Sequence, residues 1–354
     1  MQAEKYILQY GSLAGWPFQV ASALRKQGIS SLNVFRQDSW DDVADLDRRL
    51  PHDRSLMVKN TSRLNSLIAR GRFVREVSQN CSLVHYHGGV ILKNNWHHVL
   101  EGRLFAKSQI PMVMSFGGGD CRFTSQARLN NPYFYRSLDT VRDTQIHAYL
   151  KSISRYIRYV ATTPECIKYV EPYFEKCHIF RQPVDLDAIC FISPNIDRPP
   201  ILLHIPTEPL VKGTNYILEA VKKLQSEGLK FEFRYKRQLT QKEMIKEIGD
   251  CDVYIDELLC GDFGVTAVET MAAGKPTVTF IRDDLVDSHP NELPIVNANP
   301  DTIYIRLKEL ICEPSMRYEI SHASRKYAER YHKREVVVDQ LVDFYKSIGW
   351  SQQC

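Results

Sequence analysis

Short apolar runs alternate with longer amphipathic segments along almost the whole chain, and this alternation constrains the fold more than any other feature. The short runs predict strands at Lys5 to Tyr10, Ser31 to Phe35, Ser55 to Val58, Leu83 to Tyr86, Met112 to Phe116, Ile201 to Ile205, Lys230 to Tyr235, Asp252 to Ile255 and Thr277 to Ile281. Segments with apolar residues at three- and four-residue steps predict helices at Phe18 to Lys26, Arg63 to Val77, Val99 to Lys107, Asn215 to Gln225, Thr266 to Ala273, Met316 to Tyr331 and Glu335 to Ile348. Strands alternating with helices predict parallel sheets covered on both faces, hence an α/β protein.

The segment 182–200 is rich in Pro and Asp and has weak periodicity, which favours a domain boundary. We expect two doubly wound Rossmann-like domains facing a cleft. The N-terminal domain is predicted over 1–182, a linker over 183–200, and the C-terminal domain over 201–332. A terminal helical segment follows over 333–354.

Composition narrows the class of protein. The chain has 354 residues, of which 44% are hydrophobic and 25% are charged, as is usual for soluble globular proteins. No apolar run is long enough to span a membrane, and the N-terminus has no signal-peptide pattern. Nine cysteines without paired spacing indicate free thiols in a reducing compartment. We therefore expect a cytoplasmic protein.

The charge is unevenly shared between the two halves. Residues 1–190 contain 25 Lys and Arg against 17 Asp and Glu, whereas the remaining residues contain 21 against 25. A basic first half suggests an anionic partner such as a phospholipid surface, a phosphorylated acceptor or a nucleic acid. A solvated basic surface without any partner explains the same counts equally well.

The segment 256–276 is the most informative part of the chain. It reads as a strand end, a glycine-bearing turn, a short Ala-rich helix, and a glycine followed by lysine and proline. Gly264 allows the backbone to approach a ligand closely, and the free N–H groups at the start of the helix that follows favour an anion. Glu269, about one turn into this helix, has a carboxylate that can accept hydrogen bonds from sugar hydroxyls.

Phe263-Gly264, Glu269 and the run 271–276 closely resemble the donor-site motif of family 4 glycosyltransferases of the GT-B fold. The resemblance implies that Glu269 binds the ribose of a nucleotide sugar. The family has a further glutamate at the position of Gly261. Here the preceding residues 256–259 are similar to a subfamily that also has glycine there.

A second segment, 206–213, precedes an amphipathic helix and is similar to the family's strand–loop–helix that ends in Lys-Gly. The resemblance implies that Lys212 neutralises the donor diphosphate. A compact ammonium suits a leaving group that gains negative charge. The family usually has an arginine where this chain has Thr207. The candidates to compensate for it are Arg181, Arg234 and Lys236.

The N-terminal half adds to the resemblance. Gly15 lies in a loop similar to the family's first loop, which borders donor and acceptor. The segment 115–122 resembles a family stretch that has histidine at the position of Gly117, and it keeps Asp120 and Arg122. The resemblance thus implies donor contacts from Gly15 and a catalytic or acceptor-side role for Asp120 and Arg122.

His85 and His87 lie on one predicted strand, next to the segment that lacks the family histidine. His85 is a candidate to replace that histidine in catalysis, and His87 is assigned to the acceptor side. The His-x-His spacing also raises the question of a metal. We expect the two side chains to point to opposite faces, and no carboxylate motif accompanies them, so no metal site is predicted.

A predicted helix over Tyr149 to Arg158 places Lys151, Arg155 and Arg158 on a basic face. Such a helix fits an anionic bilayer and equally fits an ordinary solvent-exposed surface. The resemblance implies lipid-linked acceptors at the inner face of the plasma membrane, where the protein would attach peripherally.

The resemblance covers nearly the whole chain, and it implies a retaining glycosyltransferase. The expected donor is a nucleotide-diphosphate sugar, UDP-linked rather than GDP-linked, and the acceptor is a glycan or a lipid-linked glycan of bacterial surface polysaccharide or lipopolysaccharide. No cofactor, metal or nucleic-acid partner is expected. The last helix is expected to cross back to the N-terminal domain. Candidate catalytic residues are Asp120, His85 and Lys212; candidate donor-binding residues are Gly15, Arg181, Lys212, Gly264, Val265 and Glu269.

Two alternatives stay open. A catalytically inactive GT-B-like subunit that binds a glycan or a partner enzyme is favoured by Gly117, Thr207 and Gly261, where the family residues are missing. A nucleotide-sugar epimerase shares the fold, but it requires acids and bases that converge on the sugar and has no acceptor.

Overall fold

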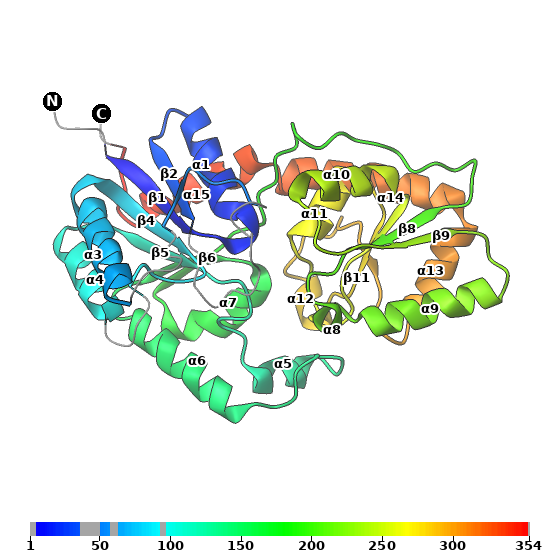
Figure 1. The fold of residues 1–354 in the computed structure, drawn as a ribbon, viewed down its shortest axis with the longest axis horizontal. Helices are drawn as coiled ribbons and strands as arrows, with labels where there is room; N and C mark the ends of the chain where they lie inside the picture. The colour runs from blue at the N-terminus through cyan, green and yellow to red at the C-terminus, as the bar shows by residue number, and fades with distance from the viewer. Residues whose placement is uncertain (1–4, 36–49, 57–62, 93–96, 353–354) are drawn as a thin grey trace. The chain divides into compact units, whose positions relative to one another are not determined.

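The chain folds into two α/β units, each built on its own parallel sheet. The computed structural model describes residues 5–35, 50–56, 63–92 and 97–352 (Figure 1). The end of the predicted strand Ser55 to Val58 lies outside the described residues.

The division into units does not follow the order of the chain. The first unit contains residues 1–123, 141–183 and 334–354, and the second contains 124–140 and 184–333. The terminal helix therefore shares a unit with the N-terminal residues. Residues 124–140, which the sequence places in the N-terminal domain, group with the second unit.

The sheet of the first unit has seven parallel strands among the residues that the structure describes, in the order β3-β2-β1-β4-β5-β6-β7. Because the chain moves outward from β1 in one direction and from β4 in the other, the sheet is doubly wound. The strands are β1 (Tyr6–Gly11), β2 (Ser31–Phe35), β3 (Arg54–Ser55), β4 (Cys81–His87), β5 (Met112–Ser115), β6 (Tyr159–Thr162) and β7 (Lys176–Ile179). The helices are α1 (Trp16–Lys26), α3 (Arg63–Asn80), α4 (His97–Lys107), α6 (Thr140–Ile153), α7 (Pro164–Val170) and α15 (Arg334–Ser347).

The sheet of the second unit has five parallel strands in the order β12-β11-β10-β8-β9. The strands are β8 (Ile201–His204), β9 (Glu232–Tyr235), β10 (Val253–Ile255), β11 (Thr277–Thr279) and β12 (Val296–Asn297). The helices are α5 (Thr124–Asn130), α8 (Pro209–Lys212), α9 (Thr214–Ser226), α10 (Gln241–Asp250), α11 (Val265–Ala272), α12 (Asp283–Val286), α13 (Ile303–Cys312) and α14 (Pro314–Tyr331).

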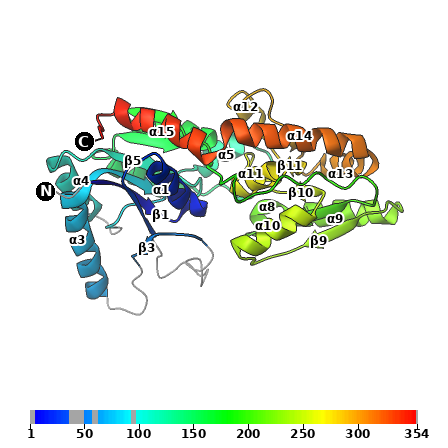
Figure 2. The ribbon, with the colours of Figure 1, turned by 90° about the horizontal axis from the view of Figure 1, so that it is seen from above.

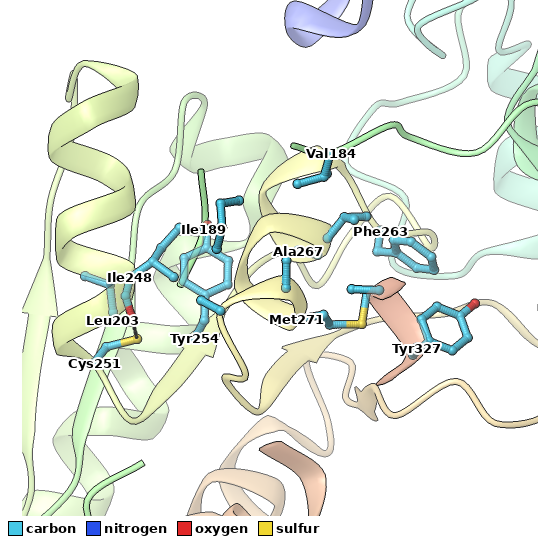
Figure 3. Close-up of a cluster of buried hydrophobic side chains, with 14 of the residues drawn as sticks. Val184, Ile189, Leu203, Ile248, Cys251, Tyr254, Phe263, Ala267, Met271 and Tyr327 are labelled. Carbon is cyan, nitrogen blue, oxygen red and sulfur yellow. Dashed lines mark hydrogen bonds between the residues drawn. The ribbon is translucent and has the colours of Figure 1, made fainter. Parts of the chain in front are cut away.

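Helix α11 is buried in the core of the second unit. Ala267 and Met271 lie on the stretch of α11 drawn in Figure 3, with Tyr254 of β10 and Tyr327 of α14 close by. All four side chains are at most 2% exposed. Because the helix is fixed by this packing, its N-terminal end has a defined position relative to the end of β10.

The fold class predicted from the sequence is confirmed, since both sheets are parallel and doubly wound. The strand Ser31 to Phe35 is found with its predicted bounds, and the other predicted strands in the described residues differ by a residue or two at their ends. The sequence analysis missed β6, β7 and β12. These three strands are short, and they lack a sustained apolar run.

The predicted helix over Tyr149 to Arg158 is wrong in its bounds, because α6 ends at Ile153. After α6 the chain turns, the Ile157 N–H donates to the Ile153 carbonyl, and the Ile157 side chain is buried. Arg155 therefore lies outside the helix. The basic face proposed for this segment does not form.

The middle of the first sheet contains a buried polar cluster. His85 Nδ1 lies 2.6 Å from the Tyr345 hydroxyl of α15, and His85 Nε2 lies 2.8 Å from the Ser115 hydroxyl. His87 Nε2 lies 2.8 Å from Gln9 Oε1. Burial lowers the pKa of His85 well below its usual range and that of His87 to about 3. Both imidazoles are therefore neutral at pH 7.

The expectation that the two histidines point to opposite faces is wrong. Residues two positions apart on a strand share a face, and the ring centroids of His85 and His87 lie 4.1 Å apart. Within the part of the chain that the structure describes, no three His, Cys, Asp or Glu side chains are grouped so as to hold a metal ion.

Helix α15 packs against α1 in the first unit, and both views show the two helices together (Figures 1 and 2). The Tyr345 hydroxyl is a buried polar link between α15 and the sheet, because it bonds to His85 and accepts from Gln9 Nε2 at 3.3 Å. The terminal helix is thus fixed by a hydrogen bond made inside the core.

Substitution of Tyr345 by phenylalanine tests this link. Tyr345→Phe leaves His85 Nδ1 buried without its partner, so we expect the free energy of unfolding to fall by about 1–3 kcal/mol in urea denaturation. Tyr304→Phe is the control, because its hydroxyl bonds to the exposed Glu227. A Tyr345→Phe protein no less stable than the control contradicts the assigned role.

Candidate donor site at the carboxyl edge of the second sheet

The chain reverses its direction across the second sheet between β8 and β10, which are neighbours. In open α/β sheets, ligands bind outside the carboxyl ends of the strands at such a switch point. Lys212 ends α8, which follows β8, and Asp256 and Glu257 directly follow β10. The switch point therefore combines one cation and two carboxylates.

Two carboxylates hold the Lys212 ammonium. Its Nζ lies 2.8 Å from Asp256 Oδ1 and 3.1 Å from Glu257 Oε2. The Lys212 carbonyl accepts from the Leu258 N–H at 3.2 Å, so the backbone is fixed to the same loop. Burial lowers the pKa of Lys212, but the charges of Asp256 and Glu257 outweigh it and leave that pKa well above its usual range. Lys212 is therefore a permanent cation.

Gly213 allows this close packing. Its φ is +72°, and a Cβ there would lie 3.1 Å from Leu259 Cγ and 3.2 Å from Leu258 Cβ. Glycine adopts this left-handed conformation without a steric penalty. The turn directly after Lys212 can therefore press against the loop that follows β10.

The Lys212 ammonium lies next to the start of α11. A Cβ built on Gly264 would lie 3.9 Å from Lys212 Nζ. The first N–H groups of a helix have no partner within the helix, and they carry partial positive charge. Val265 is the first residue of α11. The ammonium and the helix end together form a place suited to a phosphate group.

Glu269 is a buried carboxyl group on the same helix. It is 6% exposed, its Oε1 accepts from Gln241 Nε2 at 3.5 Å, and its Oε2 has no hydrogen-bond partner in the described part of the chain. Burial raises the pKa of Glu269 from 4.5 to about 7. Asp256 and Glu269 both act on the Tyr254 phenol, whose pKa is raised chiefly by burial. Glu269 is therefore an acceptor that lacks a full set of donors.

Arg282 occupies the space beside Gly261. Gly261 has a φ of +90°, and a Cβ there would lie only 2.2 Å from Arg282 Cγ. The Arg282 side chain is 1% exposed and forms two bonds to Asp284, at 2.8 and 3.1 Å. A larger residue at position 261 would have to displace this arginine.

Two of the three positions proposed to compensate for Thr207 have acidic neighbours. Arg234 lies 2.6 Å from Glu232 and 3.8 Å from Glu247, and Lys236 lies 3.9 Å from Glu247. In the second unit, Lys212 and Gly264 are the predicted donor residues that the structure places side by side.

The carboxyl edge of the first sheet holds the other predicted residues. Asp120 follows β5, and its Oδ1 accepts from the Gly117 N–H at 2.9 Å. Arg122 forms two bonds to the buried Glu165, at 2.5 and 2.6 Å. A Cβ at Gly117 would lie 2.5 Å from Leu13 Cδ1, so the Leu13 side chain fills the space beside Gly117.

The remaining predicted residues also belong to the first unit. Gly15, with a φ of +79°, is the N-cap of α1, and Arg181 follows β7 and is half-buried. His85 and His87 lie inside the sheet, at most 2% exposed. Their side chains do not reach solvent at this edge.

The sequence analysis missed three residues of the donor region. Asp256 and Glu257 appear in it only as part of a resemblance, although two acids directly after a buried strand indicate a polar strand end. Arg282 lies three residues after the end of β11, where the apolar run ends. Each of these signals is a charged residue at the end of a run that is otherwise apolar.

Known proteins resemble this chain in structure rather than in sequence. No family model matches it, and no curated protein has a similar sequence. Sucrose-phosphate synthase from Thermosynechococcus elongatus has a TM-score of 0.65 at 13% identity, and the match covers 97% of this chain and 99% of that chain. HepE from Anabaena, in complex with UDP and glucose, has a TM-score of 0.63 at 11% identity, and the match covers 97% of this chain and 100% of that chain.

A third similar structure is the lipopolysaccharide outer core galactosyltransferase WaaB, with a TM-score of 0.58 at 11% identity. The match covers 97% of this chain and 99% of that chain. These neighbours are GT-B glycosyltransferases, and the match spans nearly the full length of each. The chain therefore has the GT-B fold. Among the described residues, no helix has the length and apolar character needed to cross a bilayer.

The buried Glu269 predicts a pH dependence of stability. Its pKa is about 7 in the folded state against 4.5 as the usual value. The folded state thus holds a proton that the unfolded state has lost, and stability falls as the pH rises from about 4.5 to 7. Glu269→Gln removes this loss, which is at most about 3 kcal/mol.

Urea denaturation at about pH 5 and about pH 8 measures the effect. We expect Glu269→Gln to gain stability relative to the wild type at the higher pH only. Glu329→Gln, at an exposed site on α14, is the control and should follow the wild type at both pH values. Parallel pH curves for wild type and Glu269→Gln would show that the carboxyl is not buried as described.

Proposed function

We propose that the chain is a retaining glycosyltransferase that moves a sugar from a UDP-sugar to a hydroxyl of a glycan or lipid-linked acceptor. One observation carries the proposal: the Lys212 ammonium lies beside Gly264 at the start of α11, at the switch point of a GT-B fold. HepE, one of the similar structures, holds UDP and glucose, which favours a UDP-linked donor.

In this proposal the donor diphosphate binds between Lys212 and the N-terminal end of α11. The bond between the anomeric carbon and the phosphate oxygen breaks, and its electron pair stays on the leaving diphosphate. Lys212 and the helix N–H groups stabilise the charge that develops there. The carboxylate of Glu269, which lacks donors for Oε2 in the described part of the chain, accepts from the ribose hydroxyls.

The acceptor hydroxyl attacks the anomeric carbon, and its proton goes to an oxygen of the leaving phosphate. We propose attack from the same face as the departing group, because position 261 is glycine and provides no carboxylate nucleophile. Asp120 and Arg122 are proposed on the acceptor side, with Gly15 and Arg181 near the donor. No metal or other cofactor takes part in this scheme.

His85 is less suited to the catalytic role that the sequence suggests. Both of its ring nitrogens have partners in the core, and its pKa is lowered by burial. We propose that His85 fixes α15 and that catalysis depends on the edge residues Lys212 and Asp120.

Calorimetry and thermal shifts with UDP, GDP, CDP and ADP test the donor site. A ligand that binds only the folded state raises the melting temperature. We expect UDP to bind best and Lys212→Ala to lower its affinity at least about tenfold, as expected for loss of a charge-assisted contact. Lys222→Ala, in the exposed part of α9, is the control.

Two outcomes contradict the proposal. If no nucleotide stabilises the protein, the alternative of a catalytically inactive binding subunit gains support. If a nucleotide binds equally well to wild type and Lys212→Ala, the donor diphosphate lies elsewhere.

We further propose peripheral attachment to an anionic membrane and a lipid-linked acceptor of surface polysaccharide or lipopolysaccharide biosynthesis. WaaB, a structural neighbour, is a lipopolysaccharide galactosyltransferase. Helices α3 and α4 contact each other and lie side by side (Figures 1 and 2). Their exposed apolar side chains are Leu64, Leu67, Ile68, Leu100 and Leu104, and their exposed basic side chains are Arg72, Arg75, Arg103 and Lys107. Exposed apolar side chains together with exposed cations suit an anionic bilayer.

Vesicle sedimentation tests this surface, called the α3–α4 face. We expect binding to vesicles of phosphatidylcholine with phosphatidylglycerol and weaker binding to phosphatidylcholine alone. The double variant Leu64→Ser with Ile68→Ser should lose most of the bound fraction. Leu218→Ser, at an exposed leucine of α9, is the control. Equal sedimentation of wild type and double variant excludes the α3–α4 face as the contact.

A further inference from the structure

Lys212 faces an excess of negative charge before any donor binds. One ammonium lies within ion-pair distance of two carboxylates, Asp256 and Glu257. If both pairs persisted, a diphosphate arriving at Lys212 would meet a cluster of net negative charge. The proposed donor site therefore requires that the two carboxylates differ in what they do.

The contacts of Asp256 and Glu257 with Lys212 differ in distance and in side-chain freedom. Asp256 is the closer partner, at 2.8 Å, and it is 1% exposed. Its backbone N–H donates to the Val278 carbonyl at 2.8 Å, which fixes it to β11. A short side chain leaving a fixed backbone has few rotamers, so Asp256 can hold the ammonium in one place.

Glu257 is the more distant partner, at 3.1 Å, and it is 6% exposed. Its backbone is also fixed, because its carbonyl accepts from the Phe280 N–H at 2.8 Å and from the Thr279 hydroxyl at 2.9 Å. Its side chain has one more methylene and one more rotatable bond than that of Asp256. The carboxylate can therefore leave Lys212 without moving the backbone.

We propose that Asp256 is the positioning residue that holds Lys212 beside Gly264, and that Glu257 is a resident counter-ion which the donor diphosphate displaces. This inference rests on the proposed function. It gives the two neighbouring acids opposite effects: Asp256 favours diphosphate binding, and Glu257 competes with it.

The proposed counter-ion role of Glu257 also explains how Lys212 stays charged in a largely buried site when no donor is bound. The Lys212 side chain is only 17% exposed, so its ammonium needs a counter-ion when the site is empty. Glu257 fills this role until a phosphate replaces it. Asp256 then holds the ammonium in the same place, both when Glu257 leaves and when the phosphate binds.

Isothermal titration with UDP and with uridine, which has no phosphates, separates the two roles. Asp256→Asn should lower the affinity for UDP about tenfold or more and leave that for uridine unchanged, because only the phosphates contact Lys212. Glu257→Gln should raise the affinity for UDP several-fold, with the gain shrinking as salt is added, and should again leave uridine unchanged.

Asp252→Asn is the matched control. Asp252 is a buried aspartate at the other end of β10, where it pairs with Arg198 at 2.7 Å. Its substitution removes a buried carboxylate of the same strand and should leave the ratio of UDP to uridine affinity at the wild-type value. If Asp256→Asn does not fold, the Glu257→Gln result alone still tests whether Glu257 competes with the diphosphate for Lys212.

The outcomes separate this inference from the function on which it rests. If wild type fails to bind UDP more tightly than uridine, the diphosphate site and this inference both fall. If Lys212→Ala loses UDP but Asp256→Asn binds it like wild type, the site stands and the positioning role is wrong. If Glu257→Gln binds UDP more weakly, Glu257 does not compete with the diphosphate.

Discussion

Both sheets of this protein are parallel, and their central strands are packed between helices, so these strands have almost no surface for polar chemistry. The residues of β10 and β11 are all buried, and parallel strands of this kind are nearly continuous hydrophobic runs. On these central strands, polar side chains become accessible only where the strands end. The candidate donor site depends on this constraint, because Lys212, Asp256 and Glu257 all follow the carboxyl ends of neighbouring strands.

Polar side chains inside a sheet differ from those at its edge in how completely they are hydrogen-bonded. His85 lies in the middle of β4 and has a partner for each ring nitrogen, one of them from α15. These contacts join β4 to α15 and to β5. Glu269 lies near the edge and keeps one carboxylate oxygen without a partner in the described residues. Full bonding of His85 and incomplete bonding of Glu269 fit the structural and ligand-binding roles proposed for these two residues.

The sequence was sufficient to predict the parallel α/β fold and the helix α11, because apolar periodicity and the glycines around it are local signals. It also placed Lys212 and Gly264 in one site through the resemblance. It did not reveal that two acids hold Lys212, since their contact joins residues that are far apart in the chain. It misplaced the end of α6, because the buried turn at Ile157 continues the apolar spacing of the helix. The shared face of His85 and His87 follows from strand geometry and was predicted wrongly.

The absence of a side chain at Gly261 and the buried position of Arg282 depend on each other. A side chain at position 261 would require both a left-handed backbone and the space that Arg282 Cγ occupies. The arginine in turn can lie there, almost fully buried, because Asp284 supplies a bidentate counter-ion. The pair is thus a packed and neutralised unit, and a single substitution of Gly261 by glutamate would not create a sugar-binding carboxylate. Under the proposed function, contacts to the transferred sugar therefore come from other groups, and Lys212 supplies the charge proposed to bind the donor.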